Sequence, residues 1–297
     1  MKCGTVAVVG RANAGKSTLV NALVGEKVSI VSPKPQTTRD RIYGVLTTDE
    51  YQIVFEDTPG VYKAAGLLNS RMQKTVERTA RDTDLILFVL DGHDGLKDDD
   101  LNLLAKYAKI GAPLIVALTK TDIMQKEALP EELVAVSAVE GVSEVVPVSA
   151  RKRRNVNELL TVILGYLQES EYVFNPEAVS DKSEKFMIAE IMREKILVGY
   201  DKEIPHGVAV TVNKFGKRPD GIYDVDLDII CEKTNHKAIL IGKGGKALKE
   251  TSTIAREAME RFLGATVFLK TYVKVKENWR DNDALLRDYG YGANNDD

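Results

Sequence analysis

Residues 10–17 read Gly-Arg-Ala-Asn-Ala-Gly-Lys-Ser. They fit the phosphate-binding pattern of one glycine, four free positions and then Gly-Lys-Ser. The apolar run Val6–Val9 precedes them, and apolar residues recur at helical spacing in the segment that follows, Ser17–Val24. The sequence therefore predicts a strand, a phosphate loop and a helix in succession, which is the context that the pattern requires.

Each residue type in this pattern has a chemical reason. A Cβ atom at Gly10 or Gly15 would block the tight turn in which backbone N–H groups surround a triphosphate. Lys16 is expected to reach the β- and γ-phosphates, the Ser17 hydroxyl to bind Mg²⁺, and the helix to point its positive end at the anion. The predicted nucleotide-binding residues here are Gly10, Arg11, Ala12, Asn13, Ala14, Gly15, Lys16, Ser17 and Thr18.

Length and composition indicate an ordinary globular protein. The chain has 297 residues, enough for two domains, with 44% hydrophobic and 29% charged residues. No apolar run suits a signal peptide or a transmembrane segment, so we expect a cytoplasmic protein. Cys3 and Cys231 match no zinc or redox spacing and are expected to be reduced.

The net charge of -3 hides a segregation of charge near the C-terminus. Lys233–Lys276 contains ten basic and three acidic residues, whereas Glu277–Asp297 contains two basic and six acidic ones. A basic block in an acidic protein indicates a site for a polyanion. A solvated helix face, the alternative, would explain single lysines but not the whole block.

Strands and helices alternate along the first 170 residues. The expected strands are Arg41–Thr47, Tyr51–Glu56, Leu85–Leu90, Leu114–Leu118 and Val145–Val148. The expected helices are Leu67–Asp82, Leu101–Ile110, Glu131–Val139 and Val156–Gln168. This order predicts an α/β fold with a doubly wound, mostly parallel sheet, whose ligands lie at the carboxyl ends of the strands.

Two motifs near the phosphate loop complete a predicted Mg²⁺ and γ-phosphate site. Asp57, Thr58, Pro59 and Gly60 follow an expected strand, where a carboxylate can hold Mg²⁺ and the Gly60 N–H can face the γ-phosphate. In the loop before the second strand, Thr38 is preferred over Thr37 as a further Mg²⁺ ligand. Without the phosphate loop, an ordinary turn and two surface threonines would explain these residues.

Two later motifs predict a guanine pocket. Thr119, Lys120 and Asp122 follow one expected strand, and Ser149 and Ala150 follow the next. The Asp122 carboxylate can accept hydrogen bonds from guanine N1–H and the exocyclic amine, a donor pair that adenine lacks. The Lys120 stem could pack on the base, and the Ala150 N–H could meet guanine O6. The sequence thus predicts GTP as the substrate.

The second half predicts a KH-type RNA-binding domain. Residues 171–183 lose periodicity and form the expected linker between domains 1–170 and 184–297. The expected order is helix, two paired strands, two helices around the Gly242–Gly245 loop, and a last strand. A Gly-x-x-Gly loop in this order is typical of KH modules, which clamp single-stranded RNA. The predicted RNA-binding residues are Ile241, Gly242, Lys243, Gly244, Gly245, Lys246 and Lys249.

Together these motifs resemble translation-factor-class GTPases, and Gln36–Arg39 with the KH-type domain is similar to the Era family. The resemblance covers nearly the whole chain. It implies GTP hydrolysis, single-stranded rRNA binding near the 3′ end of small-subunit RNA, and a role in maturation of the small ribosomal subunit. It also implies RNA rather than DNA as partner, a monomeric state, and scope for peripheral association with the inner face of the cell membrane.

The chain departs from the family pattern at two positions, and from the best-known GTPases at a third. Thr119 stands where the family usually has Asn, and Ala12 where Pro is common; a hydroxyl replaces part of the amide, at about 1 kcal/mol per lost hydrogen bond. Val61 offers no amide to orient the attacking water. Resemblance to K⁺-dependent relatives implies that Asn13 binds K⁺, so the expected catalytic residues are Asn13, Lys16, Thr38 and Gly60.

Two other classes of function share parts of this sequence. A P-loop kinase would have the phosphate loop but would not need Thr119–Asp122. An RNA-binding module with a non-hydrolysing nucleotide site would share the motifs of both halves of the chain but would not hydrolyse GTP. Release of orthophosphate from GTP, without a phosphorylated product, distinguishes a GTPase from a kinase, and binding of labelled GTP distinguishes it from the RNA-binding module.

Overall fold

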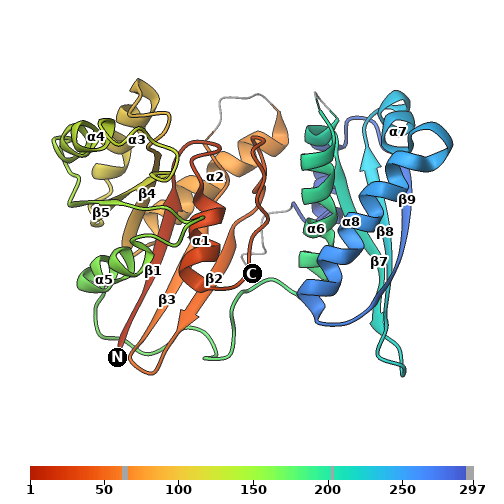
Figure 1. The fold of residues 1–297 in the computed structure, drawn as a ribbon, viewed down its shortest axis with the longest axis horizontal. Coiled ribbons are helices and arrows are strands. Elements are labelled where there is room, and N and C mark those ends of the chain that lie inside the picture. The colour runs from red at the N-terminus through yellow and green to blue at the C-terminus, as the bar shows by residue number, and fades with distance from the viewer. Residues whose placement is uncertain (62–65, 202–203, 292–297) are drawn as a thin grey trace. The chain divides into compact units, whose positions relative to one another are not determined.

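The computed structural model describes residues 1–61, 66–201 and 204–291, and they form two compact units (Figure 1). The first unit comprises Met1–Val31, Thr38–Lys63 and Met72–Asp181. The second unit comprises Ser32–Thr37, Ala64–Arg71 and Lys182–Asp297.

The first unit is built on a six-stranded sheet. The strands are β1 (Lys2–Val9), β2 (Ile42–Thr47), β3 (Tyr51–Asp57), β4 (Leu85–Asp91), β5 (Leu114–Thr119) and β6 (Glu144–Pro147). Their order across the sheet is β2-β3-β1-β4-β5-β6, and only β2 runs antiparallel to its neighbour. The predicted doubly wound, mostly parallel sheet is confirmed.

Helices cover both faces of this sheet. They are α1 (Lys16–Val24), α2 (Leu67–Arg81), α3 (Asp98–Ala108), α4 (Ala128–Ser137) and α5 (Val156–Tyr166). Side chains alternate along β1: Val6 and Val8 pack with α1 and α5, whereas Ala7 and Val9 pack with α2, α3 and α4. This alternation follows from the two-residue period of a strand, and it buries β1 and β4 almost completely.

The expected elements all form, with shifted ends. Two helices begin three residues early: α4 at Ala128 rather than Glu131, and α3 at Asp98 rather than Leu101, because three acidic residues occupy the first turn of α3. Carboxylates there interact favourably with the positive end of the helix. Apolar periodicity alone starts at the first leucine and therefore misses this polar turn.

The predicted linker has no helix or strand up to Ser183, yet its first part is ordered against the sheet of the first unit. The Val45 N–H donates to the Val179 carbonyl oxygen at 2.9 Å, and the Tyr172 hydroxyl donates to the Thr48 carbonyl oxygen at 2.6 Å. The compact units divide after Asp181. The exact domain limits stay a prediction.

The second unit has three helices on one face of a three-stranded sheet. The strands are β7 (Ala209–Lys217), β8 (Tyr223–Cys231) and β9 (Val267–Val275), in the order β7-β8-β9, with β7 antiparallel and β9 parallel to β8. The helices are α6 (Glu184–Gly199), α7 (Thr234–Ile241) and α8 (Lys246–Leu263). This arrangement confirms the predicted small α+β domain.

Residue alternation on β8 separates a core face from a polar face. Val225, Leu227 and Ile229 are buried against the helices, while Asp224, on the other face, pairs with Lys214 and Arg218. A C-terminal segment with α9 (Asp283–Asp288) adds buried Trp279, whose Nε1 donates to the Gly207 carbonyl oxygen at 3.0 Å. No helix in the described part of the chain combines the length and the apolar composition that a membrane crossing requires.

Candidate GTP-binding site and KH groove

The phosphate loop joins β1 to α1, as predicted, and its glycines are required by geometry. Gly10 has φ 144°, and a Cβ atom there would lie 2.4 Å from the Val89 carbonyl oxygen. Gly15 has φ 99° and begins α1. Asn13 is a non-glycine residue with φ 65°; its side chain is exposed and has no hydrogen bond to any described residue.

Lys16 is buried under the loop, and burial dominates its electrostatics. Its Nζ donates to the carbonyl oxygens of Gly10 at 3.1 Å and Arg11 at 2.9 Å. Desolvation lowers the pKa of Lys16 to about 8, while the Asp57 carboxylate acts in the opposite direction. The ammonium group is therefore held by carbonyl oxygens of the loop that it would help to close around phosphates.

Two hydroxyls and one carboxylate meet beside Lys16, at the end of β3. The Ser17 and Thr38 hydroxyl oxygens lie 2.8 Å apart. Asp57 is fully buried, and neither of its carboxylate oxygens has a hydrogen-bond partner among the described residues. Burial raises the pKa of Asp57, although the nearby Ser17, Ser29 and Thr38 hydroxyls favour its ionised form. Buried oxygens without partners are costly, and a hard cation such as Mg²⁺ would satisfy them.

The segment after Asp57 lies directly against the phosphate loop. A Cβ atom on Gly60 would lie 2.6 Å from the Ala12 Cα, and the Val61 N–H donates to the Gly10 carbonyl oxygen at 3.2 Å. Only glycine permits this approach, which brings the Gly60 backbone to the loop as expected. The Val61 side chain packs on the apolar core, so it supplies no polar group.

Thr119 connects the predicted base loop to the phosphate loop. Its Oγ1 lies 2.7 Å from the Ala14 carbonyl oxygen and 2.9 Å from the Leu90 carbonyl oxygen. A hydroxyl has a single proton, so it donates to one of these oxygens at a time. The threonine therefore makes the link to the phosphate loop, with fewer donors than an asparagine amide has.

The two predicted base-pocket motifs are brought together. The Ser149 hydroxyl donates to Asp122 Oδ1 at 2.6 Å, and this hydrogen bond lowers the pKa of Asp122, which stays ionised at neutral pH. Lys120 has a left-handed backbone, φ 59°, and its ammonium pairs with Asp91 at the end of β4. The carboxylate and Lys120 are thus oriented before any base binds.

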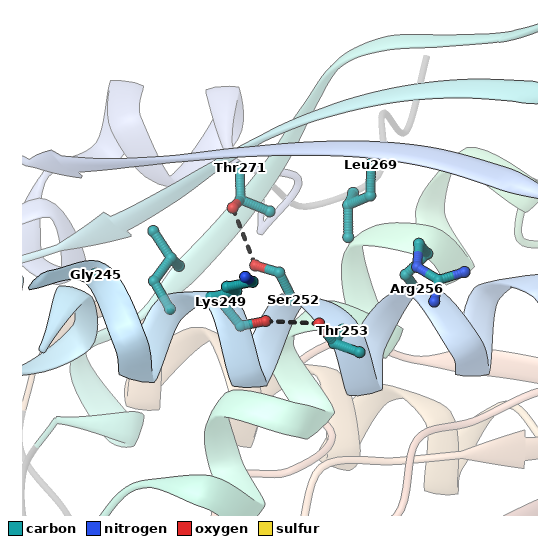
Figure 2. A pocket seen from close by; sticks show the side chains of 8 residues that line it. Gly245, Lys249, Ser252, Thr253, Arg256, Leu269 and Thr271 are labelled. Carbon is teal, nitrogen blue, oxygen red and sulfur yellow. Dashed lines mark hydrogen bonds between the residues drawn. The ribbon is translucent and has the colours of Figure 1, made fainter.

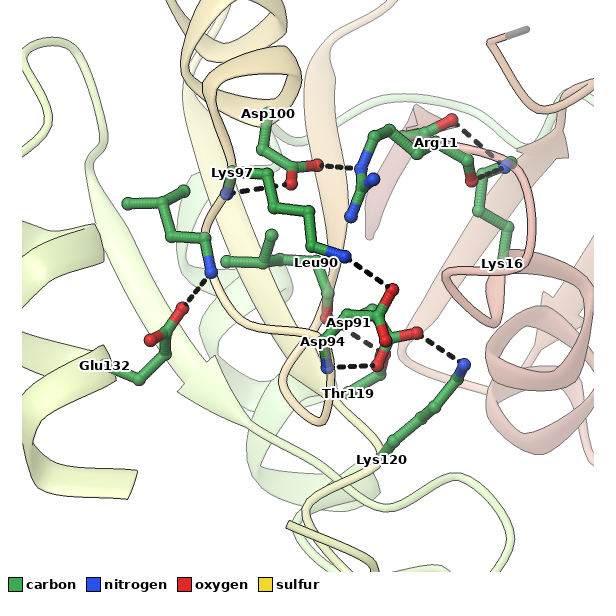
Figure 3. Close-up of polar contacts among 12 residues, drawn as sticks. Arg11, Lys16, Leu90, Asp91, Asp94, Lys97, Asp100, Thr119, Lys120 and Glu132 are labelled. Atoms are coloured by element: carbon green, nitrogen blue, oxygen red, sulfur yellow. Dashed lines mark hydrogen bonds and ion pairs between the residues drawn. The ribbon is translucent and has the colours of Figure 1, made fainter. Parts of the chain in front are cut away.

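Acidic residues from β4 and α3 support these loops, as Figure 3 shows. Arg11 Nε donates to Asp100 Oδ1 at 2.8 Å, and the Lys97 N–H donates to Asp100 Oδ2 at 3.2 Å. Asp91 accepts from the His93 N–H at 3.1 Å besides pairing with Lys120. Asp91 and Asp100 were not among the predicted site residues. The sequence alone does not indicate these two residues, because the order of strands in the sheet determines which basic residue each of them meets.

The Gly-x-x-Gly loop of the second unit joins α7 to α8. Gly242, Gly244 and Gly245 all have positive φ, at 72°, 60° and 79°. A Cβ on Gly242 would lie 2.7 Å from the Ala247 Cβ, whereas one on Gly244 or Gly245 would meet no atom within 4 Å. The first glycine therefore allows the turn, and the other two present open backbone. Lys243, at the loop, and Lys246, which begins α8, are exposed.

A groove of about 330 Å³ runs from this loop between α8 and β9 (Figure 2). Its lining is Gly245, Leu248, Lys249, Ser252, Thr253, Arg256, Leu269 and Thr271. The Ser252 and Thr271 hydroxyl oxygens lie 3.0 Å apart, and the Thr253 hydroxyl donates to the Lys249 carbonyl oxygen at 2.9 Å. The groove combines cationic, hydroxyl and aliphatic groups, which suit the phosphates, riboses and bases of a single strand.

Comparisons with known proteins find a related family for each of the two units. Residues 5–120 match the family described as 50S ribosome-binding GTPase, and residues 203–280 match the KH domain family. GTPase Era of Clostridium kluyveri is 42% identical over 291 residues, covering 98% of this chain and 99% of the relative. GTPase Era of Clostridium botulinum is 41% identical over 290 residues, covering 98% of each chain.

Solved structures of Era proteins have the same fold along the whole chain. The crystal structure of Era with MgGDPNP and nucleotides 1506-1542 of 16S ribosomal RNA superimposes with a TM-score of 0.94 at 36% identity, covering 99% of this chain and 100% of the other. A variant of Aquifex aeolicus Era bound to GDP.AlF4- gives the same TM-score, identity and coverage. On these grounds the chain belongs to the Era family of GTPases, as its sequence motifs predicted.

Proposed function

We propose that this GTPase binds the 3′ region of small-subunit rRNA through its KH unit, and that its GTP state controls this engagement during maturation of the small ribosomal subunit. One observation carries the proposal. The Era protein crystallised with MgGDPNP and nucleotides 1506-1542 of 16S ribosomal RNA shares this fold over 99% of the chain. The Gly242–Gly245 loop and the adjoining groove supply the matching chemistry in this chain.

RNA binding is assigned to the exposed side of the loop and the start of α8. Open backbone at Gly244 and Gly245 allows close approach of a phosphate, and Lys243, Lys246 and Lys249 are exposed to supply positive charge. Lys246 has only a 3.9 Å contact with Glu250, which is weak at an exposed site. Its charge thus remains available to a phosphate backbone.

Nucleotide binding and hydrolysis are assigned to the first unit. Ser17, Thr38 and Asp57 suit Mg²⁺, because the Asp57 carboxylate is buried without a hydrogen-bond partner among the described residues. When bound, Mg²⁺ would supply positive charge beside the β- and γ-phosphates. Lys16 would donate to the phosphate oxygens in place of the loop carbonyl oxygens, and the Gly60 N–H would donate to the γ-phosphate.

Asn13 is the proposed ligand of K⁺. Its exposed side chain makes no hydrogen bond within the described residues, so its amide oxygen is available to a cation next to the phosphates. K⁺ would add positive charge where other GTPases use an arginine. Val61 packs on the core and cannot position water, which makes such a charge necessary.

The test of RNA binding is a double substitution in the loop, Lys243→Asp with Gly244→Asp. Two carboxylates facing the phosphate backbone should abolish binding of RNA with the sequence of nucleotides 1506-1542. A Cβ at Gly244 meets no atom within 4 Å, and aspartate is one of the few residues that adopt a φ near 60° at modest cost, so the variant should fold.

The matched control for this double variant is Lys217→Asp with Gly221→Asp, another exposed lysine and another open glycine with positive φ, both outside the basic block. It should bind the RNA as the wild type does. Normal affinity of the Lys243/Gly244 variant would refute the assignment of RNA binding to this loop.

A further inference from the structure

Four consecutive basic residues follow the base-pocket motif, in the loop between β6 and α5. Arg151, Lys152, Arg153 and Arg154 are all exposed, and they are four of the 21 basic residues among the first 180. No carboxylate in the described part of the chain lies within ion-pair distance of them. Other cations of the same unit do have such partners: Arg11, Arg41, Lys97, Lys106 and Lys120.

The backbone of this loop is fixed by its own hydrogen bonds. Ser149 and Arg154 exchange N–H donations to each other's carbonyl oxygens, at 3.1 and 3.0 Å. The Lys152 N–H donates to the Ser149 hydroxyl at 3.2 Å, and the Arg153 N–H donates to the Ala150 carbonyl oxygen at 3.3 Å. The four side chains therefore project from a turn that is already formed, which reduces the entropy lost on binding.

This concentration of charge is unfavourable for the free protein. The residues repel one another, and they precede α5, whose positive end disfavours cations, although the Asp122 carboxylate attracts Arg151 and Lys152. Asn155 offers no compensating cap, since its side-chain amide donates to the Pro147 carbonyl oxygen instead. Glu158 lies in the first turn of α5 but forms no ion pair with the loop. An external polyanion would offset these costs.

We propose that residues 151–154 form a second RNA contact, which binds the phosphate backbone independently of the KH groove. This inference rests on the proposed RNA-binding function. The loop offers four cations and no apolar side chain to insert into a bilayer, so it suits a phosphate chain rather than a membrane surface. Because Ser149 also binds Asp122, RNA on this loop contacts the turn that orients the guanine pocket.

The experiment measures binding of the full chain to polyuridylate over a series of KCl concentrations. Polyuridylate is long enough to reach any site and has no sequence to recognise. Replacing all four residues by Ser should weaken binding roughly tenfold or more at low salt, since a linked contact is lost. The slope of log affinity against log salt should also fall by up to about 3, from ~0.7 for each of four single-strand phosphate contacts.

The matched control replaces four other exposed cations of the first unit by Ser: Lys74, Arg81, Lys109 and Lys126. It changes the net charge equally and should keep the wild-type slope. A third variant, which combines Arg151→Lys, Arg153→Lys and Arg154→Lys, keeps the charge and should bind as the wild type does. An equal loss in the control variant, or no loss in the Ser loop variant, would overturn the inference.

Two further outcomes separate this inference from its alternatives. Binding to phosphatidylglycerol vesicles that the Ser loop variant loses, with RNA binding unchanged, would assign the loop to membranes and overturn the proposal. If wild-type protein bound neither polyuridylate nor RNA with the sequence of nucleotides 1506-1542, the proposed RNA-binding function itself would fail. If only the Lys243→Asp/Gly244→Asp variant lost binding, that function would stand and this inference would fall.

Discussion

The Thr119 hydroxyl lies 2.7 Å from the Ala14 carbonyl oxygen, so a single side chain connects the base loop to the phosphate loop. Thr119→Val keeps the shape and removes the hydroxyl. It should weaken GDP and GTP binding about five- to tenfold, from the loss of about 1 kcal/mol for one hydrogen bond. Equilibrium titration with a fluorescent guanine nucleotide measures this.

The control for that change is Thr121→Val. The structure gives Thr121 a backbone hydrogen bond to the Val148 carbonyl oxygen, which the substitution leaves in place. Unchanged nucleotide affinity in Thr119→Val would show that the contact has no energetic part in binding.

The side chain at position 122 should determine which purine base the nucleotide site prefers. In Asp122→Asn, Ser149 can still donate to the amide oxygen, while the new N–H₂ can donate to the carbonyl at C2 of xanthine. Competition binding should therefore shift from guanosine toward xanthosine triphosphate. A retained guanine preference would remove Asp122 from the base pocket.

Nucleotide binding should be linked to protonation of Lys16. Its pKa is lowered to about 8 by burial, so the group is mostly neutral near pH 9 in the free protein. Phosphate oxygens favour the charged form, and binding of GDP at pH 9 should take up close to one proton, with little uptake near pH 7. Calorimetric titration in buffers of different ionisation enthalpy measures this uptake.

The lowered pKa of Lys16 also makes the stability of the fold depend on pH. The unfolded chain holds the Lys16 proton more tightly, so this group's contribution to stability increases as the pH rises from about 8 to 10.5, the ordinary pKa of a lysine. Equal proton uptake at pH 7 and pH 9 would mean that the pKa of Lys16 is not lowered in the free protein.

GTP turnover should depend on potassium. K⁺ is expected to accelerate hydrolysis and Na⁺ is not, because the smaller ion spans the same ligands poorly. Loss of a comparable charge in arginine-finger systems costs about three to five powers of ten in rate. The assay compares orthophosphate release in KCl and in NaCl, for the wild type and for Asn13→Ala.

Equal wild-type rates in the two salts would exclude a role for K⁺. A potassium effect that persisted in Asn13→Ala would instead exclude Asn13 as its ligand. The variant should fold, since the Asn13 side chain is exposed and makes no hydrogen bond with the described residues, and alanine at φ 65° costs only about 1 to 2 kcal/mol.

The sequence predicted the sheet, the KH order and the loops on which the motifs lie because these depend on local signals. Glycines with positive φ, Gly-Lys-Ser and strand alternation are all visible within a few residues. The contacts Arg11–Asp100 and Lys120–Asp91 were not predictable in this way. They join residues 89 and 29 positions apart, and strand order alone places β4 and α3 beside the loops.

Residues 151–154 carry four positive charges, but the first 180 residues together hold 21 basic and 24 acidic residues, so the overall charge of this half conceals the cluster. Only the structure shows that these four side chains are exposed, without ion-pair partners among the described residues, and carried on a turn with its own hydrogen bonds. The local density of charge therefore predicts a polyanion-binding surface better than the net charge of a whole domain does.

Control of RNA engagement by the GTP state is measured most simply as one pair of affinities. The full chain is titrated with RNA of the sequence of nucleotides 1506-1542, once with Mg²⁺ and a non-hydrolysable GTP analogue and once with Mg²⁺ and GDP. We expect at least about fivefold tighter binding with the analogue, in the ordinary range of coupling between two sites. Equal affinities in the two nucleotide states would contradict it.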